Sequence, residues 1–580
     1  MNSDQRLRSR LIFGLFIMGA AVLAVSLYWT QIVQGSQYQA KADQQYDKPN
    51  AAQFDRGTIY FESRDGTRVA AATVGSGYLV FINPSQLADP AEAYSALSQF
   101  ISVDRASFMA KATKPNDHYE VVADRIATDA AQSIRGLQIA GLNVAPETWR
   151  SYPGGTLAAH VLGLTGEDGS STNVIGRYGL ERSYEDVLGR ASAGSSANVF
   201  AQLFGGIGTA LGGASSQSGD IVTTIDPTAQ KYLEQTLSQT ESVWHSDEIG
   251  GIVMDPTTGE IVAMSSLPSF DPNDTSSIKD VSVFSDPLVE HVYEMGSIVK
   301  PLTMAMALDS GAEKPDSLYD DTGTMVLNGM KIANYDGRAR GIIPMQQILS
   351  QSLNIGAATI ALKTEKDIGT GTMFKYFSDY GLGEKSGIDE PSEASGLISN
   401  IKPGPNLRDI NIATASFGQG IAISPIEMVR ALSVIANGGY LVTPHVVDEI
   451  DHTDGTVQRI LPQKEGPVIS KTAAEDVTSM LIKVVDDTMA KVHKDMHWQH
   501  YSIAAKTGTA QIPDHVHGGY YPNRYLHSFF GFFPAYNPRF IVFLYQVYPK
   551  GAEYASETLT DPFSQLAKFL INYYNIAPDR

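Results

Sequence analysis

The sequence contains no cysteine in its 580 residues, so neither a disulfide framework nor a thiolate metal site can form. Basic residues are also scarce, because 43 Lys and Arg stand against 63 Asp and Glu, which gives a net charge of −20. General nucleic-acid binders carry a basic surface, so this balance argues against that class and predicts no nucleic-acid partner. Charged residues make up only 18% of the chain and apolar residues 43%, a composition typical of a globular protein.

Long apolar runs are missing except near the amino terminus. Residues 1–10 carry three arginines, and no charge occurs from Leu11 to Ala40. Since about 19 helical residues span the hydrocarbon core of a bilayer, we expect one transmembrane helix within residues 11–34. The arginines predict a cytoplasmic tail over residues 1–10, a single-pass anchor in the cytoplasmic membrane and an extracytoplasmic location for the rest of the chain. A signal peptide cleaved after Ala40-Lys41-Ala42 is the alternative.

The remaining chain is long enough for two or more domains. Residues 35–219 alternate short strand and helix patterns without a catalytic motif, which predicts an α+β scaffold. A strand followed by an Asp65-Gly66 turn predicts a hairpin over residues 56–73, and residues 176–188 are expected to form one helix. His160 is interpreted as a core histidine. Residues 190–219, rich in Gly, Ala and Ser, are interpreted as a linker, with a contact to a partner or membrane as the alternative.

A serine and a lysine three residues apart stand at the start of an apolar helical run in the second half of the chain, in Met295-Gly296-Ser297-Ile298-Val299-Lys300. Positions i and i+3 share one face of a helix, so the Ser297 hydroxyl and the Lys300 amine are expected to meet. Serine becomes a nucleophile when a neighbouring base takes its proton, and a lysine of lowered pKa can be that base. Alone, the motif is also compatible with an ordinary helix cap.

Two further motifs supply partners for such a nucleophile. Ser352 and Asn354 lie in a predicted loop that enters a helix, where they offer a second hydroxyl and an orienting amide, although a turn is the alternative. Lys506-Thr507-Gly508-Thr509 follows an apolar stretch and is expected at the end of an edge strand. Such a strand can pair with an extended peptide, and the glycine would let that peptide approach the backbone.

The three motifs in this order match the set found in serine β-lactamases and penicillin-binding proteins. The chain resembles the class B penicillin-binding proteins over nearly its full length. The segments that carry this resemblance outside the catalytic motifs include Arg56-Gly57-Thr58-Ile59-Tyr60, Arg150-Ser151-Tyr152-Pro153, Gly179-Leu180-Glu181, Asp255-Pro256-Thr257-Thr258-Gly259-Glu260 and Gly418-Gln419-Gly420-Ile421. The resemblance implies a mixed α/β (α+β) chain with a pedestal domain over residues 35–219 and, over residues 220–580, a penicillin-binding, β-lactamase-like transpeptidase domain whose antiparallel sheet is flanked by helices.

The resemblance also implies a reaction, the cross-linking of peptidoglycan stem peptides through a Ser297 acyl-enzyme that β-lactams block. In the implied scheme Lys300 is the base, Ser352 relays a proton, and Asn354 orients the lysine and the substrate carbonyl. Lys506, Thr507, Gly508 and Thr509 bind the substrate, whose carboxylate Lys506, Thr507 and Thr509 hold, and the backbone N–H groups of Ser297 and Thr509 form the oxyanion hole. No cofactor is expected, and the implied partners are lipid-linked nascent glycan, a polytopic membrane glycan polymerase and proteins of the division or elongation machinery.

Several alternatives remain open at the level of the sequence. A septal role is favoured over an elongation role, and a β-lactam sensor, a β-lactamase and a non-catalytic division scaffold share the same expected fold. Six of the twelve histidines lie between His493 and His527. Three of them, His493, His497 and His500, have helical spacing, so a zinc site is a conceivable alternative to surface histidines, although no metal is expected for the reaction itself.

Overall fold

The computed structural model describes residues 55–167, 174–189, 218–276 and 278–580. The expected transmembrane helix at 11–34 and most of the 190–219 stretch lie outside the described residues. Within the described part of the chain, no helix has the length and apolar character needed to cross a membrane. The described residues fall into two compact units, a smaller one over Val74–Trp149 and a larger one that contains Arg56–Thr73, residues 150–189 and residues 218–580.

The smaller unit is a short α+β layer. The second half of strand β2 (Arg68–Ile82) pairs antiparallel with β3 (Glu120–Ile126), with Phe81 opposite Val121. Strand β4 (Leu142–Ser151) also pairs with β2, and the helices are α3 (Pro90–Leu97), α4 (Arg105–Ala112) and α5 (Thr128–Gly136). Val80, Ile82, Leu97 and Phe108 form the centre of its separate core.

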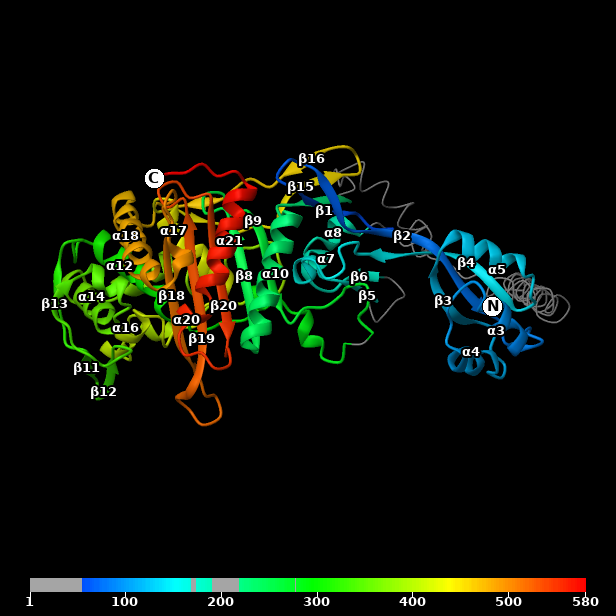
Figure 1. Cartoon of the computed structure of the whole chain (residues 1–580), viewed down its shortest axis with the longest axis horizontal. Helices are drawn as coiled ribbons and strands as arrows, with labels where there is room; N and C mark the ends of the chain where they lie inside the picture. Colours follow the sequence, from blue (N-terminus) through cyan, green and yellow to red (C-terminus); the bar gives the residue numbers. More distant parts are fainter. Residues whose placement is uncertain (1–54, 168–173, 190–217, 277) are drawn as a thin grey trace, which may run out of the picture. The chain divides into compact units, whose positions relative to one another are not determined.

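The larger unit is built on a five-stranded antiparallel sheet (Figure 1). The strand order is β18 (Ala504–Pro513), β19 (Tyr520–Phe533), β20 (Phe540–Val547), β8 (Glu248–Met254) and β9 (Ile261–Leu267), so that β18 is an edge strand. Residues Phe540–Gln546 of β20 are all buried, as expected for a strand covered on both faces. This architecture confirms the expected antiparallel sheet flanked by helices.

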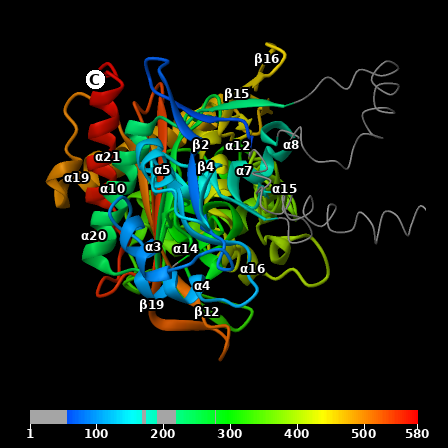
Figure 2. The ribbon, with the colours of Figure 1, turned by 90° about the vertical axis from the view of Figure 1, so that its right-hand side faces the viewer.

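Two helices lie side by side on this sheet, α10 (Pro227–Trp244) and α21 (Thr560–Tyr573) (Figures 1 and 2). Tyr232 of α10 stacks on Phe569 of α21 with 3.9 Å between ring centroids, and Phe563 of α21 stacks on Phe529 of β19. The start of α10 follows its sequence, because Asp226 accepts hydrogen bonds from the first free backbone N–H groups and Pro227 fixes the first turn.

A group of helices that contact one another contains the expected Ser297 helix, α12 (Lys300–Asp309), which packs against α14 (Asn354–Asp367), α17 (Pro425–Ala436) and α18 (Lys471–Val484). Helix α18 contacts strand β18, and α17 contacts β20. The contacts of α12 with α18, and of α18 with β18, connect the Ser297 helix to the edge of the sheet.

The other elements of the larger unit are shorter. Strands β1 (Ile59–Glu62), β7 (Gly219–Thr223), β15 (Val447–His452) and β16 (Val457–Arg459) form a second sheet with the first half of β2, and four further strand pairs are β5/β6, β10/β13, β11/β12 and β14/β17. Their bounds are Thr165–Glu167, Val174–Gly176, Leu318–Asp321, Gly341–Pro344, Thr324–Leu327, Met330–Ala333, Leu441–Val442 and Lys464–Glu465. The other α-helices in the described part of this unit are α6 (Ala159–Leu162), α7 (Gly179–Ser183), α8 (Glu185–Leu188), α11 (Pro287–Glu290), α13 (Gln346–Ser350), α15 (Thr372–Asp379), α16 (Asp409–Ala415), α19 (Ala490–Val492) and α20 (Ala555–Thr558).

The hairpin expected over residues 56–73 is present, although its second strand continues to Ile82. The single helix expected over residues 176–188 is wrong, because the chain forms α7 and α8 with a break at Tyr184. The Arg56 guanidinium donates a hydrogen bond to the backbone carbonyl of Glu181. In a continuous helix that carbonyl would instead accept from the backbone N–H of Glu185. His160 is a buried core histidine as expected, bonded to the Val283 carbonyl and the Ser266 hydroxyl.

Candidate active site

Ser297 lies in a single 3-10 turn, Gly296–Val299, directly before α12. Gly296 has φ +66°, and a Cβ there would lie 2.7 Å from the carbonyl oxygen of Thr509, so only glycine lets this turn approach strand β18. The Gly296 N–H donates to the Gly418 carbonyl at 3.1 Å, and the Ser528 hydroxyl donates to the Met295 carbonyl at 2.8 Å. These contacts fix the nucleophile turn against the sheet.

Lys300 is fully buried, and its amine makes three hydrogen bonds. Its Nζ donates to the Ser352 carbonyl at 2.6 Å, to Asn354 Oδ1 at 2.8 Å and to Ser352 Oγ at 3.2 Å. Among the described residues no hydrogen bond joins Ser297 Oγ to Lys300, so the direct contact expected from their spacing is replaced by bonds to the second motif. Hydrogen bonds between catalytic groups are often long before substrate binds. Ser297 and Lys300 remain neighbours, because no more than one 3-10 turn lies between them.

The Ser352 motif is held in a strained turn. Ser352 has φ +54°, a left-handed conformation that is uncommon for residues other than glycine and that clusters at functional sites. Asn354 is the first residue of α14 and donates from Nδ2 to the Ala333 carbonyl at 3.0 Å. Asn334 accepts from the next backbone N–H of that helix, on Ile355, at 3.0 Å. The expected loop that enters a helix is therefore present.

Lys506 is the third residue of β18 and not at its end, because the strand continues to Pro513. Its Nζ donates to Ser352 Oγ at 3.0 Å and to the Thr507 carbonyl at 2.9 Å. The Ser352 hydroxyl therefore contacts both lysines, although Ser352 is separated from them by 52 and 154 residues of sequence. The structure brings Lys300, Ser352, Asn354 and Lys506 into one hydrogen-bonded cluster.

Both lysines are less basic than an exposed lysine. Burial lowers the pKa of Lys506 to about 7. Burial and the neighbouring Lys506 amine lower the pKa of Lys300 well below its ordinary value. Among the described residues no carboxylate forms an ion pair with either lysine, so no anion there offsets the cost of burying the charge. A neutral Lys300 amine has two N–H groups, so it donates at most two of its three hydrogen bonds and keeps a lone pair. The site can therefore accept a proton near neutral pH.

The three residues after Lys506 alternate across the strand. The Thr509 hydroxyl accepts from the Ala555 N–H at 3.0 Å, which leaves its own proton free to be donated to a substrate oxygen. The sequence predicted that Gly508 lets a bound peptide approach the backbone, but the structure gives a different reason for this glycine. A Cβ there would lie 2.7 Å from the Met295 carbonyl oxygen and against Ser528, so the glycine admits the nucleophile turn rather than a peptide.

This approach predicts the effect of Gly508→Ala. The added methyl group would push the turn that carries Ser297 away from β18, so we expect Ser297 acylation by a fluorescent penicillin to slow by about 100-fold, the penalty typical of misplaced reacting groups. Gly136→Ala is the matched control, because a Cβ there would meet no atom within 4 Å. Equal acylation rates for the two variants would contradict this account of Gly508.

The histidines between His493 and His527 do not share one environment. His527 is buried between the Thr558 hydroxyl and the Glu553 carbonyl, whereas His493 lies 3.6 Å from Asp561 and His517 lies 3.0 Å from Asp514. No group of three or more His, Cys, Asp or Glu side chains suited to a metal ion occurs among the residues that the structure describes. The described geometry therefore offers no support for the zinc alternative.

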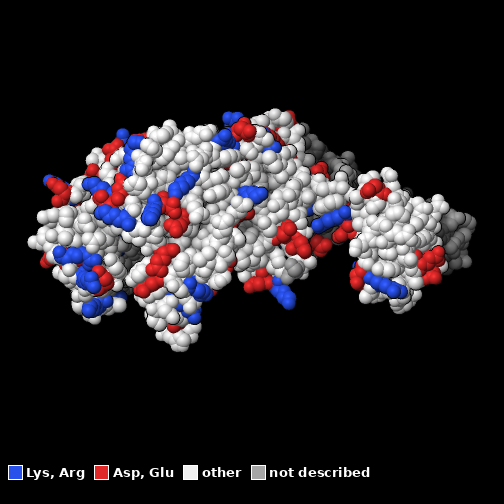
Figure 3. All heavy atoms as spheres, in the orientation of Figure 1, with Lys and Arg blue, Asp and Glu red and all other residues white. Residues whose placement is uncertain are grey.

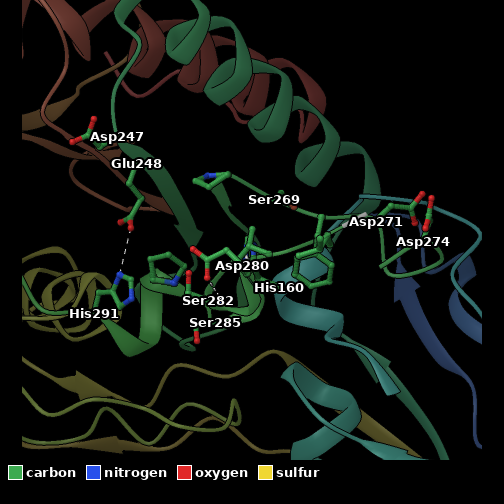
Figure 4. Close-up of a pocket in the computed structure, with 15 residues that line it drawn as sticks. His160, Asp247, Glu248, Ser269, Asp271, Asp274, Asp280, Ser282, Ser285 and His291 are labelled. Atoms are coloured by element: carbon green, nitrogen blue, oxygen red, sulfur yellow. Dashed lines mark hydrogen bonds and ion pairs between the residues drawn. The ribbon is translucent and has the colours of Figure 1, made fainter. Parts of the chain in front are cut away.

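A pocket of about 700 Å³ lies elsewhere in the larger unit (Figure 4) and holds none of the expected site residues. Its carboxylates already have partners within the protein. Figure 4 shows His291 directed at Glu248, at 3.4 Å, while Asp271 and Asp280 accept backbone N–H groups of Asn273 and Ser282 in local turns. Over the face in Figure 3, acidic and basic side chains are interspersed. The candidate catalytic residues are therefore those of the lysine cluster and not those of this pocket.

Comparison with known proteins identifies the family. A sequence model of the penicillin binding protein transpeptidase domain matches residues 249–567, which is more than half of the chain. The chain belongs to the penicillin-binding protein transpeptidase family. A second model, of the penicillin-binding protein dimerisation domain, matches residues 52–219. The expected membership among the class B penicillin-binding proteins is thereby confirmed.

Similar proteins cover nearly the whole of this penicillin-binding protein. Stage V sporulation protein D of Bacillus subtilis is 30% identical over 97% of this chain and 85% of its own length. The peptidoglycan D,D-transpeptidase FtsI of Escherichia coli K12 is 24% identical over 99% of this chain and 92% of its own length. Among solved structures, penicillin-binding protein 2X of Streptococcus thermophilus has a TM-score of 0.70 at 20% identity, covering 90% of this chain and 80% of its own. This chain therefore shares the fold of the family.

Sequence motifs missed the residues that hold this site in place. Asn334 and Ser528 bond to the Asn354 helix and to the nucleophile turn, yet neither belongs to a recognisable pattern. Only their proximity in the folded chain identifies them, because the bonds cross 21 and 233 residues.

Proposed function

We propose that this protein is a serine-type peptidoglycan DD-transpeptidase that cross-links stem peptides in septal cell-wall synthesis. The observation that carries the proposal is the hydrogen-bonded Lys300–Ser352–Asn354–Lys506 cluster one turn from Ser297 in a chain of the penicillin-binding family. Relatives named peptidoglycan D,D-transpeptidase support the substrate class.

In the proposed first step, neutral Lys300 takes the Ser297 proton as Ser297 Oγ attacks the carbonyl between the two terminal D-Ala residues. The Ser297 and Thr509 backbone N–H groups stabilise the oxyanion, an assignment supported by the close approach of the Ser297 turn to Thr509. Lys506, Thr507 and Thr509 bind the terminal carboxylate. The leaving D-Ala amine receives a proton through Ser352, which contacts both lysines.

In the proposed second step, the amine of a neighbouring stem peptide attacks the acyl-enzyme and loses its proton to Lys300, which passes a proton to Ser297 Oγ as the bond between that oxygen and the acyl carbon breaks. Asn354 orients Lys300 and the acyl carbonyl throughout. Residues 11–34 would anchor the chain in the cytoplasmic membrane, with a pedestal over residues 35–219 and a catalytic domain over residues 220–580. The dimerisation-domain match that ends at residue 219 supports this division. A polytopic membrane glycan polymerase and division proteins are the proposed partners.

One experiment separates this function from its rivals. A fluorescent penicillin should label the purified wild-type protein at Ser297, and the label should persist for many minutes. Unlabelled protein should transfer the acyl group of a synthetic acyl-D-Ala thioester to an added amine, with release of the thiol. Complexes of a penicillin-binding protein 3 with aztreonam and with ampicillin support β-lactams as ligands of this fold. Rapid release of the label would favour a β-lactamase, and absence of labelling would favour a scaffold. A fluorescent fusion spread along the side wall would contradict the septal role.

The lysine pair predicts a dependence on pH. The positive charge of Lys506 disfavours protonation of Lys300, so removing that charge in Lys506→Gln raises the Lys300 pKa and leaves less neutral base at a given pH. We therefore expect the midpoint of the pH profile, where the acylation rate reaches half of its maximum, to shift upward by about one pH unit. Rates of penicillin acylation between pH 5.5 and 9 measure it. Lys506→Arg keeps the charge and should keep the midpoint while its rate falls, and an unshifted midpoint in Lys506→Gln would contradict the coupling.

A further inference from the structure

Glu294 lies three residues before Ser297, and the proposed reaction leaves it without a role. Its carboxylate accepts the Gly420 N–H at 2.9 Å and the Tyr520 hydroxyl at 3.0 and 3.1 Å. The side chain is only partly exposed, and burial raises the pKa of Glu294. Among the described residues no Lys, Arg or His forms an ion pair with it. The two donors are neutral, so the negative charge of this carboxylate is not balanced within the described protein.

The position of Glu294 follows from the direction of a bound peptide. Strand β18 is an edge strand, so an extended peptide can pair along it. The terminal carboxylate belongs at the Lys506 end of the strand because the cation is there. The attacked carbonyl then lies at Ser297 and Thr509, and the rest of the peptide continues toward Pro513.

Glu294 lies beside the path that the peptide follows from Thr509 toward Pro513. Pro513 pairs with Tyr520, and the Tyr520 hydroxyl contacts Glu294. Glu294 is also two residues from Gly296, which touches Thr509. The carboxylate is therefore placed past the reacting centre, on the side opposite the Lys506 cation.

We propose that Glu294 is a specificity-determining residue that binds an ammonium group of the peptide substrate. The inference rests on the proposed function and adds a substrate requirement to it. Two peptide sources share this chemistry, because an ammonium group can belong to the donor peptide upstream of the attacked carbonyl or to the incoming acceptor. An ammonium would restore neutrality at Glu294, and the two neutral donors would hold the carboxylate in place to receive it.

The donor arm of the test compares two penicillins that differ by one ammonium group. Ampicillin carries an amine on the side chain that benzylpenicillin lacks, and competition with a fluorescent penicillin gives the acylation rate for each. In Glu294→Gln, the amide oxygen can still accept from Gly420 and Tyr520, but the charge is gone. If the donor carries the ammonium, the ampicillin-to-benzylpenicillin rate ratio falls about fivefold, as expected for one half-buried ion pair, while the benzylpenicillin rate is retained.

The acceptor arm measures how the acyl-enzyme formed from a thioester without an ammonium group divides between water and added D-lysine, which can attack with one amine while its second amine remains an ammonium ion. If the acceptor carries the ammonium, Glu294→Gln lowers the ratio of aminolysis to hydrolysis and leaves the penicillin ratio unchanged. Tyr520→Phe is the comparison variant, since it removes one of the two donors that position the carboxylate without removing the negative charge, and it should lower the affected ratio by less than Glu294→Gln does. A loss of general packing would slow benzylpenicillin and ampicillin equally.

Unchanged ratios in both arms would overturn the Glu294 subsite and leave the proposed function intact. A wild-type protein that is labelled by both penicillins but fails to use the thioester would end the proposed transpeptidase function, and the penicillin ratio would then decide the subsite alone. A wild-type protein labelled by neither penicillin would end both.

Discussion

Ser297→Ala is expected to abolish covalent labelling by penicillin and to lower transpeptidation by at least about 10⁴-fold, the scale seen when a serine nucleophile is removed. The variant has no oxygen to attack the carbonyl, and Lys300 and Ser352 cannot substitute for it because both bond within the lysine cluster. Gel fluorescence and thioester turnover measure the two effects. Folding should be unaffected, because no hydrogen bond of the Ser297 hydroxyl occurs among the described residues.

Ser310→Ala is the matched control for this prediction. Ser310 stands at the far end of the same helix, where its hydroxyl bonds only to the Ala307 carbonyl, so labelling should persist. Ser352→Ala provides a second comparison, since it removes the hydroxyl shared by the lysines and should slow labelling while the label still forms on Ser297. A covalent label on Ser297→Ala, located by mass spectrometry at another residue, would refute Ser297 as the nucleophile.

The sequence predicted the individual parts of the site because each part depends on residues that are close together in the chain. The start of α12, the loop before Asn354 and the edge strand that carries Lys506 depend on residues within a few positions of each motif. The expected hairpin over residues 56–73 formed for the same reason, since its Asp-Gly turn is a local signal.

Features set by distant contacts were not predictable in this way. The left-handed turn at Ser352 is uncommon for serine and is maintained by its surroundings, where both lysines contact it. The role of Gly508 depends on the Met295 carbonyl before the nucleophile turn, 213 positions away in the chain, which periodicity does not encode. The break between α7 and α8 likewise depends on Arg56, a residue from another segment.

Arg56 belongs to a buried ion cluster that predicts the largest effect on stability. Glu181 is fully buried, and its carboxylate bonds to Arg56 Nε at 2.5 Å and to Arg150 Nε at 2.6 Å. The sequence identified the segments around all three residues only as family motifs. In the folded chain they tie α7 to the segment before β1 and to the end of β4, since Arg150 also donates to the Gly57 carbonyl at 2.7 Å.

Glu181→Gln is expected to destabilise the protein by about 3–5 kcal/mol, the cost of leaving buried charges unpaired. The amide keeps the volume of the carboxylate but removes the anion between two buried guanidinium groups. Arg56 keeps its ion pair with Glu185 at 2.7 Å, whereas Arg150 keeps no carboxylate partner among the described residues. The midpoint of thermal or denaturant unfolding, followed by tryptophan fluorescence, should fall accordingly. Glu62→Gln is the matched control, because its ion pair with Arg68 is about one-third exposed on both sides and contributes at most about 1 kcal/mol.

A combined variant distinguishes charge imbalance from lost packing. Replacing all three residues by apolar ones of similar length, as in Arg56→Met, Arg150→Met and Glu181→Leu together, removes the fully buried charges and leaves only the partly exposed Glu185, so it should be more stable than Glu181→Gln alone. If the triple variant is instead less stable than Glu181→Gln, the hydrogen bonds of Arg56 to the Glu181 carbonyl and of Arg150 to Gly57 hold these segments together, and charge pairing is secondary. The difference between the two midpoints therefore separates the charge balance of the cluster from the backbone contacts that its arginines make.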